Sequence, residues 1–297
     1  MIDCALVPKP VRHKTRAEEA AIHPYFREWL SEMSLPGYFD APFDLHALSD
    51  DDHQEMRAVY FGLIAEVDHQ IGRIIDYLKA TGEYDETLIV FTSDHGEMLG
   101  DHWAWGKGGF YDGSNHIPLI IRDPFASTTA RGRQVDALTE SVDLLPTILE
   151  WMGCVVPTEA NGTSLAPWLS DDSPRSWRRA VFWEFDFRNS VTKRYETALS
   201  LSSDECTLNV IRDHHYKYVH FTALPPLLFD LRRDPHELHN LAHDPHYASV
   251  IADYAQKLLS HRMLHAERTL TNAMLSAGGV VYRNEPRGKP DMLYGLL

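Results

Sequence analysis

Cysteine is scarce in this chain: its 297 residues contain three, namely Cys4, Cys154 and Cys206. Three thiols are an odd number and lie far apart, which argues against a disulfide framework and against a zinc cluster. Long apolar runs are missing as well, since no stretch approaches the roughly 18 residues of a transmembrane helix. The first nine residues contain no apolar signal-peptide core. We therefore predict reduced thiols and a cytoplasmic protein.

Positive charge is also in short supply. The sequence has 28 lysines and arginines against 43 aspartates and glutamates, which gives a formal net charge of −15. No basic stripe offsets this charge, so neither a nucleic-acid partner nor a membrane partner is expected. A small anionic substrate is still compatible with the composition, because a bound metal ion and one lysine can invert the local field.

Residue patterns predict alternating helices and strands. Apolar residues recur at spacings of three and four from Met56 to Leu78, between a Ser49–Asp50 start and Gly82, and predict one long amphipathic helix. Other helices are expected at 16–30 with an interruption near Pro24, at 142–152 with Trp151 and Met152 in the core, and at 250–259. Strands are expected at 87–92 and 117–121. From about residue 180 a period of two predicts antiparallel strands at 180–185, 197–202, 207–212, 216–221 and 227–231.

The end of the expected strand 87–92 is the most informative segment. Its run Leu88-Ile89-Val90-Phe91 is apolar, and Asp94 and His95 follow it directly. Ligands of open α/β sheets bind just beyond the carboxyl ends of the strands, which is where these two side chains would lie. A carboxylate next to an imidazole suits Mn, Zn or Ca, whereas the alternative is an exposed pair in a turn. Because two ligands are too few for a metal site, others must come from elsewhere.

Residues 96–116 follow this pair, are rich in glycine, and are expected to form a long functional loop. The loop holds Lys107, which suits either a solvated position or a contact with an anionic substrate. His102 and His116 are further ionisable candidates, and Glu97 is expected to anchor the loop. Four aromatic residues fit core packing and a pocket for an aromatic ester equally well: Trp103, Trp105, Phe110 and Tyr111.

Further motifs follow in order along the chain. They are Phe91-Thr92-Ser93-Asp94-His95-Gly96-Glu97 with Leu99-Gly100-Asp101-His102, Lys107 with Gly108 and Tyr111, Ile117-Pro118-Leu119-Ile120, Val142-Asp143-Leu144-Leu145-Pro146, Gly162-Thr163-Ser164-Leu165, Trp183-Glu184-Phe185-Asp186, Lys217-Tyr218-Val219-His220-Phe221, and Leu228-Phe229-Asp230-Leu231 followed by Asp234-Pro235. Taken together, this ordered set resembles the second half of enzymes in the sulfatase branch of the alkaline phosphatase superfamily. The resemblance is strongest to the phosphonate monoester hydrolase and arylsulfatase group.

The resemblance implies an α/β fold of the alkaline phosphatase/sulfatase type. A partial, mostly parallel sheet flanked by helices would be followed by a smaller antiparallel sheet with a packed carboxyl-terminal helix. Residues 1–175 would be the carboxyl-terminal portion of the sulfatase-like domain, with the metal motif, and residues 176–275 the antiparallel-sheet subdomain. Residues 276–297 would form a tail that is a candidate oligomer contact.

The resemblance also implies roles for individual residues. Asp94 and His95 correspond to two ligands of one divalent metal ion, either Mn or Ca, with Zn as an alternative. Lys107 corresponds to the lysine that binds an oxygen of the ester and stabilises charge in the transition state. His116 is a candidate proton donor to the leaving group. The family's nucleophile is a formylglycine made from a C-x-P-S-R-type motif, and none of the three cysteines lies in such a motif.

We therefore predict a metal-dependent hydrolase of phosphonate, phosphate or sulfate esters, with a small anionic ester as substrate and a homo-oligomeric state. The 297 residues are expected to lack the nucleophile segment and to be inactive, or nearly so, by themselves. The alternative is a truncated, non-catalytic module that binds a metal or forms oligomers. A two-metal phosphatase or mutase would need a second metal cluster, and the sequence contains no His-rich set for one.

Overall fold

The computed structural model describes residues 2–33, 45–157, 159–170, 174, 176–265 and 273–282. Its α-helices are α1 (Arg16–Ala20), α2 (Pro24–Glu32), α3 (Asp50–Thr81), α4 (Asp112–Asn115), α5 (Leu144–Trp151), α6 (Ala166–Leu169), α7 (Arg194–Leu199) and α8 (Ala248–His265). Its strands are β1 (Ile89–Thr92), β2 (Leu119–Arg122), β3 (Val181–Asp186), β4 (Thr207–Arg212), β5 (Tyr216–Phe221), β6 (Leu227–Asp230), β7 (Ala273–Ser276) and β8 (Gly279–Tyr282).

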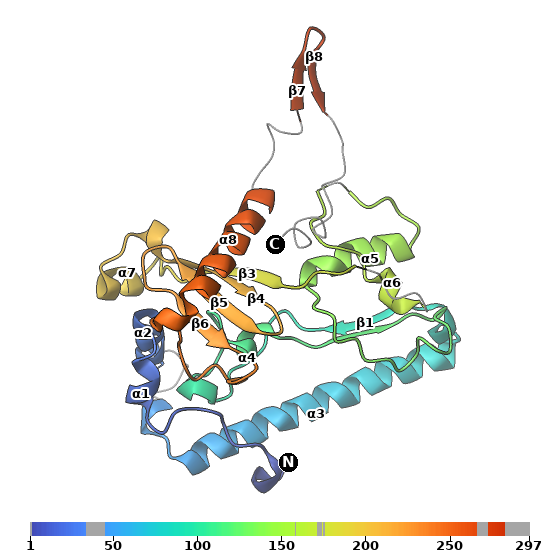
Figure 1. Cartoon of the computed structure of the whole chain (residues 1–297). Coiled ribbons are helices and arrows are strands. Elements are labelled where there is room, and N and C mark those ends of the chain that lie inside the picture. The colour runs from blue at the N-terminus through green and yellow to red at the C-terminus, as the bar shows by residue number, and fades with distance from the viewer. Residues whose placement is uncertain are drawn as a thin grey trace.

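The helix α3 begins and ends where the sequence predicts. The Ser49 side chain accepts a hydrogen bond from the backbone of Asp52, whose own side chain accepts from the backbone of Ser49. Gly82 ends the helix in the left-handed conformation, which costs a glycine little. The buried residues of α3 are all near its start, at His53, Arg57 and Ala58. The rest of this long helix runs along one side of the molecule (Figure 1).

The strand pairs found in the described ranges are all antiparallel. Strand β1 pairs with β2, from Ile89 opposite Arg122 to Thr92 opposite Leu119. We expected both strands in a mostly parallel sheet, and for this pair that expectation is wrong. Parallel neighbours need a crossover connection, usually through a helix, whereas the glycine-rich loop after β1 folds back and returns the chain beside it. The expected small antiparallel sheet is present, with the strand order β3-β4-β5-β6.

The main hydrophobic core lies on one face of this four-stranded sheet. Side chains of α2, such as Phe26 and Trp29, pack there with residues of β4 to β6, such as Leu208 and Phe229. Three of the four loop aromatics are buried in the same core, and the fourth, Trp103, packs against it. Core packing therefore accounts for the loop aromatics. The core draws on both sides of residue 175, and the expected domain division there stays a prediction.

Helix α8 covers the other face of the sheet, as expected for the carboxyl-terminal helix (Figure 1). Tyr254 and Leu258 of α8 pack against Ile211, Tyr218 and Leu228 of the sheet. These sheet residues alternate with those that face the main core, which is the period of two that predicted the strands.

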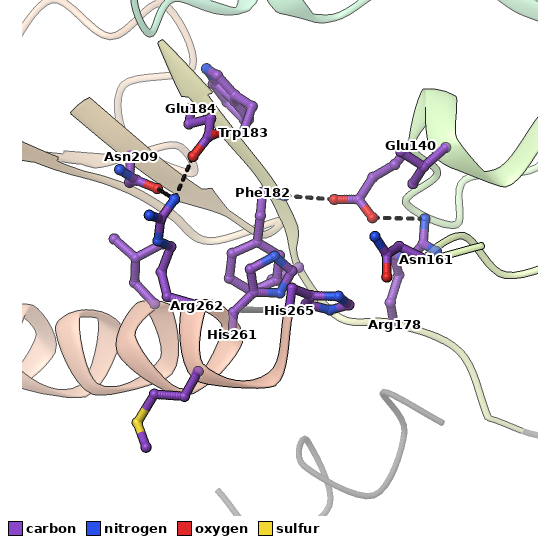
Figure 2. A pocket seen from close by; sticks show the side chains of 14 residues that line it. Glu140, Asn161, Arg178, Phe182, Trp183, Glu184, Asn209, His261, Arg262 and His265 are labelled. Atoms are coloured by element: carbon purple, nitrogen blue, oxygen red, sulfur yellow. Dashed lines mark hydrogen bonds and ion pairs between the residues drawn. The ribbon is translucent and has the colours of Figure 1, made fainter. Parts of the chain in front are cut away.

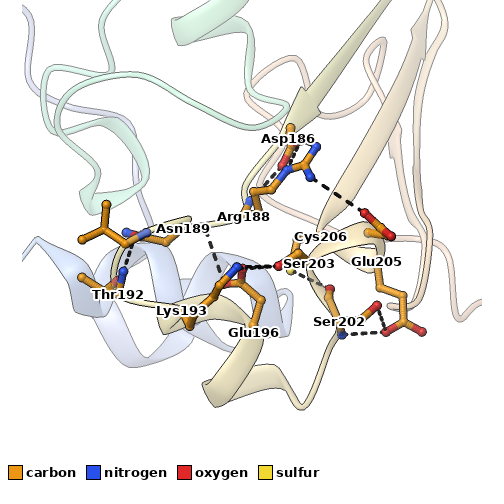
Figure 3. A network of polar contacts seen from close by, with 12 residues as sticks. Asp186, Arg188, Asn189, Thr192, Lys193, Glu196, Ser202, Ser203, Glu205 and Cys206 are labelled. Atoms are coloured by element: carbon orange, nitrogen blue, oxygen red, sulfur yellow. Dashed lines mark hydrogen bonds and ion pairs between the residues drawn. The ribbon is translucent and has the colours of Figure 1, made fainter.

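The strand expected at 197–202 is wrong. Residues up to Leu199 belong to α7, and Ser200 ends this helix with a φ of 57°, in the left-handed region. The alternation of polar and apolar residues arises because Leu199 and Leu201 both pack against the main core, one from the helix end and one from the turn after it. A polar network holds this turn, in which Lys193 Nζ donates to Ser203 Oγ at 2.7 Å and Ser203 Oγ donates to Glu196 at 3.0 Å (Figure 3).

Several smaller expectations have clear outcomes. All three cysteines are free thiols, as predicted. Met152, expected in the core, is 62% exposed. Across the described ranges we find no helix with the length and apolar character that a bilayer crossing requires. The expected tail overlaps the β7–β8 hairpin, which projects from the body in Figure 1, and residues 283–297 lie outside the described residues.

Candidate metal centre

Asp94 and His95 lie just beyond the carboxyl end of β1, as the sequence predicts. The Asp94 side chain is 84% exposed, and its Oδ2 lies 3.4 Å from His95 Nε2. Its other oxygen, Oδ1, accepts a hydrogen bond from the backbone N–H of His95 at 3.0 Å. The carboxylate and the imidazole therefore face each other at the surface.

The contacts of His95 indicate which of its ring nitrogens could bind a metal ion. His95 Nδ1 lies 2.8 Å from the carbonyl oxygen of Gly96. Because a carbonyl oxygen only accepts hydrogen bonds, Nδ1 carries a proton, and in the neutral ring Nε2 is then the nitrogen with the lone pair. Nε2 faces Asp94 on one side and contacts Lys107 Nζ on another. A metal-binding histidine is commonly oriented in this way, by a carbonyl on its second nitrogen.

The neighbours of Asp94 affect the pKa of its carboxyl group. Desolvation raises the pKa of Asp94, but His95, the adjacent backbone amides and Lys107 together outweigh it and lower the pKa below its usual value. Asp94 is consequently a carboxylate at neutral pH. Together, Asp94 and His95 offer one anionic oxygen ligand and one neutral nitrogen ligand, a donor set that fits Mn, Zn or Ca.

The short helix α4 fixes the segments on both sides of the site. The backbone N–H of Gly96 donates to the carbonyl of Ser114 at 2.8 Å, and that of Gly108 donates to Ser114 Oγ at 3.2 Å. At Gly96 a Cβ atom would lie 2.1 Å from the carbonyl oxygen of Gly113, so only glycine fits this approach. Through these contacts α4 sets the position of the His95 turn and of the Lys107 turn.

Glu97 anchors the same loop, as expected. Its Oε1 accepts hydrogen bonds from the backbone of Gly106 at 2.5 Å and of Leu99 at 3.3 Å. His102, by contrast, is buried away from the site. It binds Glu19 Oε1 through Nδ1 at 2.8 Å and stacks on Tyr111 with ring centroids 3.8 Å apart. His102 therefore has a structural role in this fold.

A buried ionic network ties α4 to the antiparallel sheet. Lys217 of β5 is completely buried, and its Nζ donates to Asp112 Oδ1 at 2.5 Å and to the Phe110 carbonyl at 2.9 Å. Lys217 also forms an ion pair with Glu237, and Arg212 binds Asp112 Oδ2 at 3.1 Å. Burial raises the pKa of Asp112, but Lys217 and Arg212 outweigh it and lower the pKa overall. Lys217 begins one of the family-like motifs, but the sequence of that motif did not indicate that the lysine would be buried in an ionic network.

The site opens into a cleft of about 710 Å³, which Asp94, His95 and His116 all line. His116 is exposed there, whereas Lys107 reaches the site through its contact with His95. A second cavity of about 770 Å³ adjoins the cleft and shares Glu140, Phe182 and Trp183 with it (Figure 2).

Side chains in the second cavity are largely paired with one another. Arg262 binds Glu184 and also Asn209, the latter at 3.0 Å (Figure 2). His261 stacks on Phe182 with ring centroids 3.6 Å apart. This second cavity therefore adds no group to the chemistry of Asp94 and His95.

The described residues contain no cluster of three or more His, Cys, Asp or Glu side chains placed to hold a metal ion. A two-metal phosphatase or mutase would need a second such cluster, and the described residues do not provide one. Asp94 and His95 Nε2 are therefore a candidate pair of metal ligands rather than a complete ligand set.

Two family profiles match this chain. The profile described as sulfatase matches residues 12–154, and the profile described as N-sulphoglucosamine sulphohydrolase, C-terminal, matches residues 100–264. A relative from Trinickia caryophylli, the multifunctional alkaline phosphatase superfamily protein PehA, is 46% identical over 279 residues. That match covers 94% of this chain and 54% of PehA.

Solved structures agree with these profiles. The phosphonate monoester hydrolase of Agrobacterium radiobacter is 44% identical and superposes with a TM-score of 0.87, over 95% of this chain and 56% of that one. The phosphonate monoester hydrolase SpPMH from Silicibacter pomeroyi is 39% identical with a TM-score of 0.86, over 97% of this chain and 56% of that one. The chain thus spans about half the length of these relatives.

Proposed function

Because this chain belongs to the sulfatase branch of the alkaline phosphatase superfamily, we propose that it forms part of a metal-dependent hydrolase of phosphonate, phosphate or sulfate esters. The observation that carries the proposal is the convergence of three groups: the Asp94 carboxylate, the lone pair of His95 Nε2 and the Lys107 ammonium. An anion-binding metal centre needs a ligand set and a positive charge next to it. Asp94 and His95 would contribute two of the ligands, and Lys107 the charge.

Asp94 and His95 would hold the metal ion, Mn or Ca with Zn as an alternative. When bound, such an ion polarises an oxygen of the ester and lowers the pKa of the nucleophile. The protein prepares for it by keeping Asp94 ionised and by fixing the His95 ring through the Gly96 carbonyl. The Asp94 carboxylate then has no proton to lose when the ion binds.

Lys107 would bind a nonbridging oxygen of the ester and stabilise the negative charge that grows in the transition state. Its exposed ammonium already lies next to the ligand nitrogen of His95. His116 would give the proton of a ring nitrogen to the leaving alcohol, since it lines the same cleft as Asp94 and His95. The small anionic ester would thus lie between a cationic wall and a proton donor.

No cysteine lines the cleft that holds Asp94 and His95. We therefore propose that these 297 residues do not supply the nucleophile and that, by themselves, they hydrolyse esters slowly or not at all. The names of the solved relatives at 44% and 39% identity, both phosphonate monoester hydrolases, favour phosphonate monoesters over sulfates as the substrate class.

The test is an assay of the chain assembled with the part of PehA that the match leaves uncovered. We expect Mn-dependent hydrolysis of an aryl phosphonate monoester, and a loss of at least a hundredfold in kcat/KM for Asp94→Asn. Asp68→Asn on the exposed surface of α3 is the matched control and should keep full activity. A folded, metal-loaded complex that hydrolyses neither aryl phosphonates nor aryl sulfates would contradict the proposal.

A non-catalytic, oligomer-forming module is the second candidate. The β7–β8 hairpin favours it, since Leu275, Val280 and Val281 are exposed there, and we propose that this hairpin contacts a second copy. Light scattering should then show an oligomer that Leu275→Asp dissociates and that Val191→Asp, an exposed change elsewhere, leaves intact. An oligomer that survives Leu275→Asp contradicts this role.

We also propose that the chain divides into two domains at residue 175. This division predicts preferred proteolytic cleavage between residues 170 and 176.

We propose a cytoplasmic location for the protein. The three free thiols support it, and cell fractionation would test it.

A further inference from the structure

The long helix α3 exposes an apolar row for most of its length. The row consists of Val59, Leu63, Ile64, Val67, Ile74 and Tyr77, whose exposed fractions lie between 49% and 64%. No residue of α3 after Ala58 is buried. In globular proteins an amphipathic helix turns its apolar stripe toward a core, so a row of this length indicates a missing neighbour.

The sheet and the helix next to α3 show the same feature. No residue of β1 or β2 is buried, and Ile120 of β2 is exposed. On α5 and just after it, Leu145, Ile148 and Met152 are exposed as well. A hollow of about 480 Å³ separates β1 from α5, lined by Val90, Ile148 and Trp151 among others.

Figure 1 draws the β1–β2 ribbon between α3 on one side and α5 on the other. We call these exposed apolar surfaces of α3, β1–β2 and α5 the open layer. Among the described strands, β1 pairs only with β2, so each keeps one edge without a neighbour. Unpaired edges accept an additional strand, because their N–H and C=O groups are free to pair.

We propose that the open layer docks the part of a sulfatase-type domain that this chain does not contain, and that the docked part places apolar β-strands beside β1–β2. The inference rests on family membership and on the exposed surface, not on the proposed activity.

The relatives point to this occupant. The superposition on the Agrobacterium enzyme covers 95% of this chain, and only 56% of that enzyme. The elements of the open layer therefore have counterparts there, beside a large remainder that is available to cover them. A layer of helix, sheet and helix is a stable arrangement when strands fill the space between the helices. An anionic membrane is a poor alternative, given the net charge of −15.

The experiment co-expresses the tagged chain with the part of PehA that the match leaves uncovered. Purified material is examined by light scattering for its stoichiometry and by hydrogen exchange for protection of α3 and β1. We expect a one-to-one complex in which amides of residues 89–92 exchange at least tenfold more slowly than in the chain alone. Hydrolytic activity is not needed for this result, so a failure of the proposed function leaves it readable.

Two double variants on the same helix identify the surface. Val67→Asp with Ile74→Asp places two charges in the apolar row and should weaken the complex at least tenfold. Ala65→Asp with His69→Asp, two exposed positions on the opposite side of α3, should change the affinity less than twofold. Both replace exposed side chains, so the chain itself should stay folded, which circular dichroism checks.

Three outcomes overturn the proposal. One is a folded chain that forms no complex with the PehA segment. Another is a complex that both double variants weaken equally. The third is a homodimer in which α3 is already protected in the chain alone, because the occupant would then be a second copy.

Discussion

Lys217 Nζ lies 2.5 Å from Asp112 Oδ1, at a place where the lysine side chain has no exposed surface. This contact joins β5 of the antiparallel sheet to the first residue of α4. Helix α4 in turn holds the turn after His95 through Gly96 and the turn after Lys107 through Gly108. The distant strand β5 therefore helps to set the position of the candidate metal ligands.

Replacing this lysine should destabilise the protein strongly. In Lys217→Met, Asp112 and the buried Glu237 lose their shared cation, and removing one partner of a buried ion pair typically costs about 3–5 kcal/mol. Urea unfolding should show this loss. The control is Lys257→Met, which breaks the i,i+4 pair with Asp253 on the surface of α8 and should cost at most about 0.5 kcal/mol. Equal losses in both variants would show that the network has no special importance.

Gly96 provides a second test of the link between α4 and the metal ligands. In Gly96→Ala the added methyl group meets the carbonyl oxygen of Gly113, so the backbone after His95 has to move. We expect a loss of about 1–3 kcal/mol in unfolding free energy and weaker binding of Mn.

Gly62→Ala is the matched control, since its Cβ meets no atom within 4 Å. Alanine there should stabilise α3 by up to about 1 kcal/mol and leave Mn binding unchanged. If Gly96→Ala bound Mn as tightly as the original chain, the contact with α4 would not set the ligand geometry.

Local patterns predicted a large part of this fold. The Ser49 cap and Gly82 gave both ends of α3, and the period of two gave β3 to β6, because these signals depend on neighbours in sequence. The segment at 197–202 misled, since its alternation comes from packing a helix end and a turn against one core. Nothing in the local pattern distinguishes these two cases.

The candidate site likewise has parts that the sequence could predict and parts that it could not. Asp94 and His95 follow β1 in sequence, and their placement could be predicted from the strand. The burial of Lys217 could not, because it depends on Asp112 and Glu237, which are far away in sequence and approach only in the folded chain. The exposure of the α3 row was also unpredictable, since an apolar stripe indicates that a helix face is buried but not by what.

Lys107 should oppose metal binding in the isolated chain. Its ammonium contacts the His95 nitrogen that would ligate the ion, and a unit charge about 4 Å from a divalent ion of the same sign is repelled by about 2 kcal/mol in water. Lys107→Met should therefore raise the affinity for Mn severalfold, measured by calorimetry. Asp94→Asn should lower it at least tenfold, and His116→Gln should leave it unchanged. A fall in Mn affinity for Lys107→Met would show instead that the lysine supports the metal site.

His23 should make the stability of the protein depend on pH. It is buried at the start of α2, where Nε2 binds the Pro225 carbonyl at 2.9 Å and Nδ1 accepts the N–H of Tyr25 at 3.2 Å. Desolvation by this burial lowers the pKa of His23 to about 4, although the Pro225 carbonyl raises it somewhat. Protonation at Nδ1 would also remove the acceptor for the Tyr25 amide.

The sign follows from the two pKa values. Between the unfolded value of 6.5 and the folded value of about 4, the unfolded chain binds more protons, so this stabilisation is complete above pH 6.5 and is lost as the pH falls toward 4. The loss from His23 should reach about 2–3 kcal/mol at pH 4. Asparagine keeps the helix-capping acceptor without titrating, so in His23→Asn the difference in unfolding free energy between pH 7 and pH 4 should shrink by that amount. The exposed His214→Asn should retain the full difference, and an unchanged difference in His23→Asn would rule out His23 as its source.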